Sequence, residues 1–309
     1  AYSGENIDHE LCKTLAKICG RSAIWLTEDP YQIKENLKNI DIFDLIFTND
    51  EAMVSQYGAK GRHLLIPGSK NIYFKEVLSN EKQLKYDVFF CGTAWPNRVR
   101  QIKTLLEENK NQLLNLKISM PTNEYLPDFQ LSIPMSEYDW RCTTDSFAIF
   151  SNISLVTLAL PREFSGGQGY EKALTPPPRV FEVAMSGSVQ LVHTSMTSMS
   201  KYFEDQKDFF YYSDVKECLS IVKELRQNFS LRTAVAKASQ RKAVEHYDYQ
   251  NSVEYILDQV TRINPKKPKI IPTRKKIMFV LHNDPFAQHY GGVEVYLRQI
   301  RRILEKEYD

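Results

Sequence analysis

Residues 176–192 read Pro-Pro-Pro-Arg-Val-Phe-Glu-Val-Ala-Met-Ser-Gly-Ser-Val-Gln-Leu-Val, and this stretch predicts a helix that leads directly into a buried strand. Proline suits the first turn of a helix, because its missing N–H would have no partner there. Gly187 can adopt the left-handed conformation that ends a helix. A helix followed at once by an apolar strand is part of the repeating unit of an α/β fold.

The rest of the chain repeats this alternation. Short apolar runs predict strands at residues 23–26, 43–47, 63–66, 86–92, 114–118, 154–160 and 209–212. Helical spacing is predicted between most of them, including residues 138–150. Strands that alternate with helices indicate an α/β fold with parallel sheets. Ligands of such folds bind beyond the carboxyl ends of the strands.

Length and composition restrict the function classes. The 309 residues are enough for about two domains, each with its own core. With 42% apolar and 25% charged residues, the composition is that of an ordinary globular protein. A net charge of +2 gives no reason to expect nucleic acid or an acidic membrane as a partner. The apolar runs are too short to span a bilayer, so no transmembrane segment is expected.

The five cysteines are scattered and never form a Cys-x-x-Cys pair. This pattern argues against a zinc site or a disulfide framework and fits a reducing compartment, so we expect a cytoplasmic protein. The sequence begins at Ala1 without a methionine and stops at Asp309 within a helical pattern. We therefore expect it to be a fragment of a longer chain.

Glu182 and Arg179 are the first candidate binding residues. Glu182 lies near the start of the predicted helix, where the helix dipole favours an anion and free N–H groups can face a phosphate. A carboxylate at this place can accept hydrogen bonds from sugar hydroxyls. The alternative is a simple ion pair on the surface, because Arg179 precedes Glu182 by three residues.

Two glycine-containing turns are further candidates. Gly92 and Thr93 join a predicted strand to a helix, a turn that presents backbone N–H groups to an anion, and Arg98 can add positive charge. The alternative is a solvated, basic helix start. Gly166 and Gly167 lie in the loop at residues 161–170, where glycine lets the backbone approach a substrate closely. That loop could equally be a disordered insertion.

Glu28 and Asp29 are the candidate catalytic residues. They follow the strand predicted at residues 23–26 and therefore lie at a carboxyl end, where ligands of parallel sheets bind. The alternative is local turn chemistry, because Asp-Pro favours turns and acidic residues cap helices.

Several of these stretches resemble a known family. Arg-Val-Phe-Glu-Val-Ala-Met-Ser-Gly at residues 179–187 resembles the donor-binding helix of GT-B glycosyltransferases, and looks most like the CgeB-like (spore-maturation-protein-like) branch. Trp-Leu-Thr-Glu-Asp-Pro-Tyr at residues 25–31 and Asp-Leu-Ile-Phe-Thr-Asn-Asp at residues 44–50 are similar to the same branch. The resemblance implies a GT-B-type fold, with two Rossmann-like domains facing across a cleft.

The resemblance also implies an activity. Such an enzyme moves a sugar, typically a hexose, from a UDP-, GDP- or dTDP-sugar to a glycan or lipid-linked acceptor, here in cell-surface polysaccharide biosynthesis. Glu182 would hold the ribose, Arg98 and the Gly92–Thr93 turn would bind the diphosphate, and Arg179 would orient Glu182 or contact phosphate. Glu28 or Asp29 would face the acceptor. Similar enzymes usually need neither a metal nor another cofactor.

The expected domains are residues 1–74, a truncated acceptor-side domain, and residues 75–262, the donor-binding domain. A basic, proline-containing linker follows at 263–274. Residues 275–309 are expected to open a second glycosyltransferase module, because Gly-Gly-Val-Glu-Val-Tyr-Leu at residues 291–297 resembles the glycine loop of such enzymes.

One position departs from the family pattern. Many retaining GT-B enzymes carry two glutamates eight residues apart, and the earlier position here is Leu174. The resemblance implies retention of anomeric configuration, but this sugar contact is missing. Two alternatives therefore stay open. One is a non-catalytic scaffold that binds nucleotide or glycan, and the other is a GT-B nucleotide-sugar epimerase, which would need an acid/base pair in its cleft.

Overall fold

The computed structural model describes residues 9–111, 113–121, 138–139, 142–163, 167, 169–265 and 300–303. The chain divides into two compact units. The first unit contains residues up to Ile66, the segment Gly167–Thr175 and the chain from Tyr249 onward, and the second contains Pro67–Gly166 and Pro176–Asp248. Of the sequence predictions, the linker and the second module at residues 266–299 lie outside the described residues.

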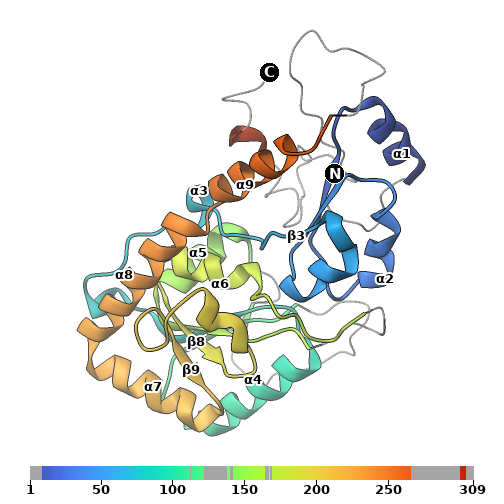
Figure 1. Cartoon of the computed structure of the whole chain (residues 1–309). Coiled ribbons are helices and arrows are strands. Elements are labelled where there is room, and N and C mark those ends of the chain that lie inside the picture. Colours follow the sequence, from blue (N-terminus) through green and yellow to red (C-terminus); the bar gives the residue numbers. More distant parts are fainter. Residues whose placement is uncertain are drawn as a thin grey trace. The chain divides into compact units, whose positions relative to one another are not determined.

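The first unit is built on a parallel sheet with the strand order β1-β2-β3. Figure 1 labels its strand β3 and its helices α1, α2 and α9. Ala23 pairs with Leu45 and Ile46 pairs with Gly61, so all three strands point the same way. The strands are β1 (Ala23–Leu26), β2 (Leu45–Thr48) and β3 (Gly61–His63), and the described helices of this unit include α1 (His9–Ile18), α2 (Ile33–Asn36), η1 (Leu37–Asn39), η2 (Glu51–Lys60) and α9 (Tyr249–Thr261).

Helix α9 belongs to the first unit because it completes the core on one face of that sheet. The rings of Tyr249 and Trp25 lie 6.2 Å apart, and those of Tyr255 and Phe47 lie 6.1 Å apart. The predicted boundary at residue 262 had placed this helix in the donor-binding domain. Its aromatic residues, which are far from Trp25 in sequence, determine the different grouping.

The second unit contains a six-stranded parallel sheet with the order β6-β5-β4-β7-β8-β9. Its strands are β4 (Tyr86–Cys91), β5 (Leu116–Ser119), β6 (Tyr138–Asp139), β7 (Ser154–Ala159), β8 (Val189–His193) and β9 (Phe210–Tyr212), and the described helices of this unit include α3 (Lys70–Tyr73), η3 (Glu81–Gln83), α4 (Pro96–Glu108), α5 (Thr144–Asn152), α6 (Pro178–Met185), η4 (Thr197–Lys201), α7 (Val215–Gln227) and α8 (Phe229–His246). The helix predicted at residues 138–150 is wrong at its start, because Tyr138 and Asp139 pair with β5 as a strand.

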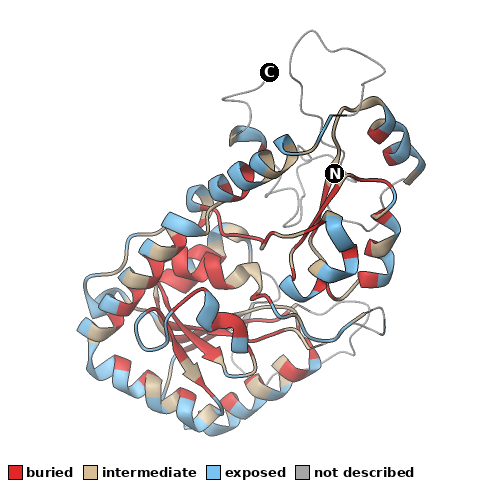
Figure 2. Cartoon of the chain, viewed as in Figure 1, coloured by how far each residue is buried: buried red, intermediate tan, exposed pale blue. Residues whose placement is uncertain are grey.

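Both faces of this sheet are covered, and strands β4, β5, β7, β8 and β9 are almost entirely buried (Figure 2). Val88 and Phe90 of β4 face the core cluster that includes Ile102 of α4 and Val222 of α7. Phe89, on the opposite face, packs against Phe147 of α5 with ring centroids 5.6 Å apart. Continuous apolar strands are expected where helices cover a parallel sheet on both sides.

Buried polar side chains tie the segment before β4 to the second unit. Gln240 of α8 donates to the carbonyl oxygens of Lys75 and Met185 at 2.8 and 2.7 Å. Asn152 donates to the carbonyl of Glu76 at 3.0 Å and to that of Ser186. The Gly68 amide also donates to the carbonyl of Tyr247 at 3.1 Å, and the Lys70 amide donates to the Asp248 side chain at 3.0 Å. These last two bonds explain why the unit begins at Pro67, whereas the sequence had placed the boundary at residue 74.

Gly187 ends α6 with a φ of +72°, and it tolerates little added volume. A Cβ atom there would lie 3.1 Å from the Lys75 carbonyl oxygen and 3.1 Å from Val77. Gly187→Ala is therefore expected to lower the free energy of unfolding by about 1–2 kcal/mol, measured by chemical denaturation. Gly167→Ala is the control, because its φ is +79° but nothing lies within 4 Å of the added atom. Equal losses in both variants would show that crowding at Gly187 has no effect.

Candidate functional site

The sheet order of the second unit identifies one edge as the place for a ligand. Strands β4 and β7 are neighbours at the middle of the sheet. From β4 the chain continues to β5, toward one edge of the sheet, and from β7 it continues to β8, toward the other edge. This is a topological switch point, where ligands of open α/β sheets bind beyond the carboxyl ends of the strands. The end of β4, the end of β7 and helix α6 therefore supply the candidate site.

Helix α6 carries Glu182 as a buried acid with two partners. The Glu182 side chain is only 2% exposed, and its Oε2 lies 2.8 Å from Nη1 of Arg179. The Tyr73 hydroxyl also hydrogen-bonds to the Glu182 carboxylate. Burial, followed by the negative charge of Glu182, raises the pKa of Tyr73, so its hydroxyl stays protonated as a donor. The ion pair between Arg179 and Glu182 that the sequence suggested is present. Its carboxylate is buried, so it is not a simple surface pair.

Arg179 is fixed on its other side by an aromatic ring. Its guanidinium lies over the ring of Phe147, 3.9 Å from the centroid, as expected for a cation–π contact. The side chain is nevertheless 41% exposed. A rigid, partly accessible guanidinium beside a buried carboxylate can bind an anion while the carboxylate accepts hydroxyl hydrogen bonds.

The Gly92–Thr93 turn lies at the end of β4, as predicted. The Gly92 amide donates to the carbonyl of Ser119, and the Ala94 amide donates to that of Pro121, both at 3.0 Å. Within the described part of the chain, the Thr93 amide makes no hydrogen bond. Of these three amides, that of Thr93 is therefore the one available to an anion.

Arg98 folds back over this turn. Its guanidinium donates to the carbonyl oxygens of Thr93, Leu160 and Pro161 at 3.0–3.3 Å. A Cβ atom on Gly92 would lie 3.0 Å from Arg98 Nη1, so glycine makes room for the guanidinium. Arg98 thus joins the end of β4 to the end of β7 and brings a positive charge to the site.

Glu28 and Asp29 lie in the first unit, after β1. Asp29 is fully buried, and its carboxylate accepts hydrogen bonds from Asn36, Thr48 and Tyr57 at 2.6–2.7 Å. Glu28 is only partly buried. The structure therefore surrounds Asp29 with donors from its own unit and leaves Glu28 as the more accessible acid.

The two candidate glycines of the loop at residues 161–170, Gly166 and Gly167, are considered next to the residues that follow them. Gly166 lies outside the described residues. The carbonyl of Gly167 accepts a hydrogen bond from Lys34 at 3.1 Å. Further along this loop, the amides of Leu174 and Thr175 donate to the buried Asp50 at 2.6 and 2.9 Å. Segment 167–175 is therefore part of the first unit, although both its flanks belong to the second.

The structure adds residues that the sequence did not single out: Tyr73 beside Glu182, Phe147 beneath Arg179, and Cys91 at the end of β4. Tyr73 was hidden at the end of the predicted domain 1–74, and Phe147 in a helix whose sequence gave no sign of a contact with Arg179. Of these three residues, only Cys91 could have been found from the sequence, because it stands immediately before the candidate residue Gly92.

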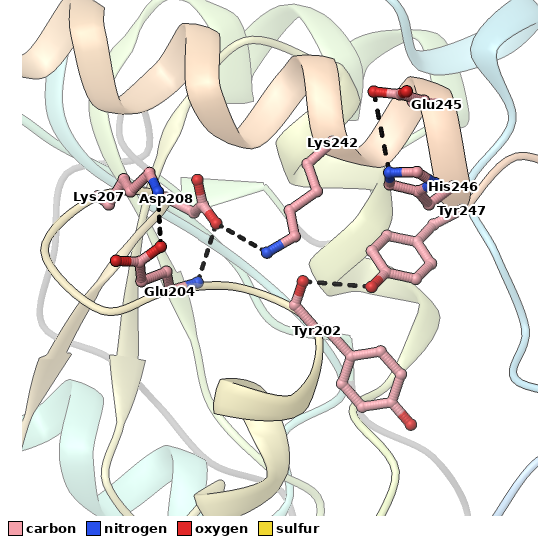
Figure 3. Close-up of polar contacts among 8 residues, drawn as sticks. All are labelled: Tyr202, Glu204, Lys207, Asp208, Lys242, Glu245, His246 and Tyr247. Carbon is pink, nitrogen blue, oxygen red and sulfur yellow. Dashed lines mark hydrogen bonds and ion pairs between the residues drawn. The ribbon is translucent and has the colours of Figure 1, made fainter.

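A second polar feature of this unit lies elsewhere. A hollow of about 220 Å³ is lined by charged residues of α8 and of the segment before β9. Figure 3 shows its ion pairs, Lys242 with Asp208 at 3.2 Å and Lys207 with Glu204 at 2.7 Å. Asp208 lies two residues before the start of β9, so this hollow lies near the amino end of that strand. The two ion pairs hold the loop before β9. The hollow is lined by other residues than the candidate site.

Over the described ranges, no group of three acidic, histidine or cysteine side chains could hold a metal ion, and the expectation of a metal-free reaction stays a prediction. In the same ranges, no helix has the length and apolar character that a bilayer crossing requires.

Comparisons with known proteins give one family and a set of similar folds. The profile of the family described as "Glycosyl transferase-like" matches residues 74–258, more than half of the chain. A sequence search of curated proteins gives no match.

Three solved structures illustrate the similarity of fold. An α-glucosyltransferase in complex with UDP-glucose and DNA containing an abasic site has a TM-score of 0.55 at 10% identity, and the match covers 78% of this chain and 72% of that one. HepE from Anabaena, in complex with UDP and glucose, has a TM-score of 0.52 with the same identity and coverage. Sucrose-phosphate synthase from Thermosynechococcus elongatus has a TM-score of 0.51 at 8% identity, with 77% and 67% covered. The predicted α/β, GT-B-type fold with parallel sheets is confirmed.

Proposed function

Because this chain belongs to the glycosyl transferase-like family, we propose that it transfers a sugar from a nucleotide-sugar donor to an acceptor. The observation that carries the proposal is the buried Glu182, paired with Arg179 and Tyr73 at the switch point of the donor-side sheet. Two proteins of similar fold were solved with UDP and glucose or with UDP-glucose. We therefore propose a UDP-hexose as the donor to test first.

Each residue of the site has a proposed role. Glu182 accepts hydrogen bonds from the ribose hydroxyls, and Arg179 contacts the diphosphate while holding the carboxylate in place. The Thr93 amide donates to a phosphate oxygen, and Arg98 keeps the turn rigid and adds positive charge. Fixed donors and cations stabilise the charge that develops on the leaving diphosphate, which is an electrostatic form of catalysis.

On the acceptor side, Glu28 is the better candidate for contact with the acceptor hydroxyl. Asp29 already accepts three hydrogen bonds, so we propose that it positions the backbone next to Glu28. The acceptor class, a glycan or a lipid-linked glycan, is a proposal, as are the CgeB-like branch, the role in cell-surface polysaccharide synthesis, the cytoplasmic location and a second module after residue 275.

Leu174 favours one alternative. It stands where many retaining enzymes have a sugar-binding glutamate, and here its described hydrogen bond is made by the backbone amide to Asp50. A module with this replacement could bind nucleotide without turnover and serve as a scaffold. No observation in the structure favours the epimerase.

A thermal-shift screen of UDP, GDP, dTDP and CMP tests the proposal. A ligand at a hundredfold excess over its Kd stabilises the folded state by about 2.7 kcal/mol, so a clear rise in Tm is expected with UDP. Turnover of UDP-hexoses is then measured with glycan acceptors. Binding without turnover would favour the scaffold. A folded protein that none of the four nucleotides stabilises would contradict the donor-site assignment.

A further inference from the structure

One arginine holds the turn after β4 against the segment after β7. Nε of Arg98 donates to the carbonyl oxygens of Leu160 and Pro161 at 3.2 and 3.1 Å, and Nη2 donates to that of Leu160 at 3.0 Å. Nη1 donates to the carbonyl oxygen of Thr93 at 3.3 Å. The buried Asn97 adds a bond from Nδ2 to the carbonyl oxygen of Pro161 at 3.0 Å. The chain that follows Pro161 therefore starts from a fixed point beside the turn.

These bonds engage all three nitrogen atoms of the Arg98 guanidinium. A guanidinium carries five N–H donors in a rigid fork, and here each nitrogen faces at least one backbone carbonyl. Moving this group onto a phosphate would leave those carbonyls without their donors, and an unsatisfied buried acceptor costs free energy. Arg98 therefore maintains the turn, and a direct contact with a diphosphate is better made by another cation.

Arg162, the residue after Pro161, supplies such a cation. Its guanidinium carbon lies 4.5 Å from the centroid of the Trp95 ring, as expected for a cation–π contact. Trp95 is buried and immediately precedes the first residue of α4. Arg162 is only partly buried. The end of β4 therefore provides the ring, and the end of β7 provides the charge that rests on it.

An arginine held on a ring suits a phosphate. The ring contacts the face of a stacked guanidinium, whereas the N–H groups lie in its plane and can form two parallel bonds to a phosphate. A side chain that is already held also loses less conformational entropy when a ligand binds. The Trp95 amide donates to the carbonyl of Thr93 at 2.7 Å, so the ring belongs to the same turn as the Thr93 amide.

We propose that Arg162 binds the diphosphate of the nucleotide-sugar donor, and that Trp95 holds the guanidinium in position. This inference rests on the proposed function, because the diphosphate is part of that function. It adds a contact from the end of β7 to those proposed for Arg179 and the Thr93 amide.

The two arginines form a symmetrical arrangement. Arg179 lies over Phe147 of α5, 3.9 Å from the ring centroid, and Arg162 lies over Trp95 at the start of α4. Helices α4 and α5 cover opposite faces of the sheet. Each face therefore contributes one arginine that an aromatic ring supports. Two fixed positive charges match a ligand that carries two phosphate groups.

Removing the charge of Arg162 should weaken the binding of UDP and leave that of uridine unchanged, because uridine has no phosphate. Arg162→Ala and Arg162→Met are each expected to raise the Kd for UDP by about tenfold or more, the effect of losing one charge-assisted contact. The methionine keeps an apolar chain over the Trp95 ring, so it tests the inference even if the alanine variant does not fold. Arg162→Lys keeps the charge without the planar fork and should recover part of the affinity.

Isothermal titration calorimetry of the full chain, with UDP and with uridine at high concentration, measures these effects at one fixed salt concentration. Arg241→Ala is the matched control and should bind like wild type. It removes the same charge from an exposed residue of the same unit, which lines the hollow beside α8. An unchanged Kd for UDP in a folded Arg162→Met protein would overturn the inference. Equal losses for UDP and uridine would also overturn it, because a merely structural role would weaken both ligands.

The wild-type titration separates this inference from the proposed function. If the folded wild type binds none of the nucleotides in the screen, the proposed function fails and the inference fails with it. If the wild type binds UDP and the Arg162 variants bind it equally well, the proposed function stands and only the assignment of Arg162 is wrong.

Discussion

Replacing Glu182 by alanine should remove most of the stabilisation that the preferred nucleotide gives to the wild-type protein. The carboxylate is buried in the candidate site and held by Arg179, so it is oriented before the ligand arrives. Hydrogen bonds to a charged group contribute about 1.5–3 kcal/mol, which corresponds to a loss of affinity of about tenfold to more than a hundredfold. Isothermal titration calorimetry with UDP measures this loss directly.

The controls separate binding from folding. Glu182→Gln keeps the size of the side chain and an oxygen that can accept from Tyr73, so it should fold better than the alanine variant while still binding nucleotide weakly. Glu217→Ala removes an exposed glutamate from the first turn of α7 in the same unit and should bind like wild type. Unchanged UDP affinity in a folded Glu182→Ala protein would exclude Glu182 from the donor site.

Replacing Asp29 by alanine should destabilise the first unit by about 3–5 kcal/mol, because each buried donor left without its acceptor costs about 1–3 kcal/mol. Three donors, from Asn36, Thr48 and Tyr57, would lose their common acceptor in a fully buried place. Hydrogen–deuterium exchange of peptides from β1 and β2 is the appropriate measurement, because it reports on the first unit alone, whereas a two-unit chain need not unfold in one step.

The neighbouring acid provides the contrast. Glu28→Ala should cost less stability than Asp29→Ala, because Glu28 is only partly buried. If Glu28 contacts the acceptor, the same variant should lower kcat/KM for transfer while leaving UDP binding intact. A folded, fully protected Asp29→Asn protein that has lost only turnover would reverse the two assignments and make Asp29 the catalytic acid or base.

The sequence predicted the fold wherever the information is local. Pro178 and Gly187 delimit α6, and uninterrupted apolar runs identify β4, β7 and β8. These signals arise from backbone geometry and burial, which a short segment specifies by itself. Strand β6 was missed because it has only two residues, and its pairing with β5 decides its conformation.

The site was only partly predictable, for a related reason. The position of Glu182 near a helix start could be read from its neighbours, but its burial and its bond to Tyr73 depend on a residue 109 positions earlier in the sequence. Likewise, Asp29 looked like a cleft acid because a strand precedes it. The donors that surround it come from three separate elements of the first unit.

The position of α9 has a consequence for synthesis on the ribosome. Trp25 and Phe47 emerge early, but the aromatic residues that cover them, Tyr249 and Tyr255, emerge about two hundred residues later. Until then, one face of the β1–β3 sheet lacks its covering helix. The second unit has all its strands by residue 212, so it can complete its sheet while the earlier segment still waits. In the growing chain, the unit that begins first is therefore the last to mature, and a nascent-chain chaperone would find its exposed surface there.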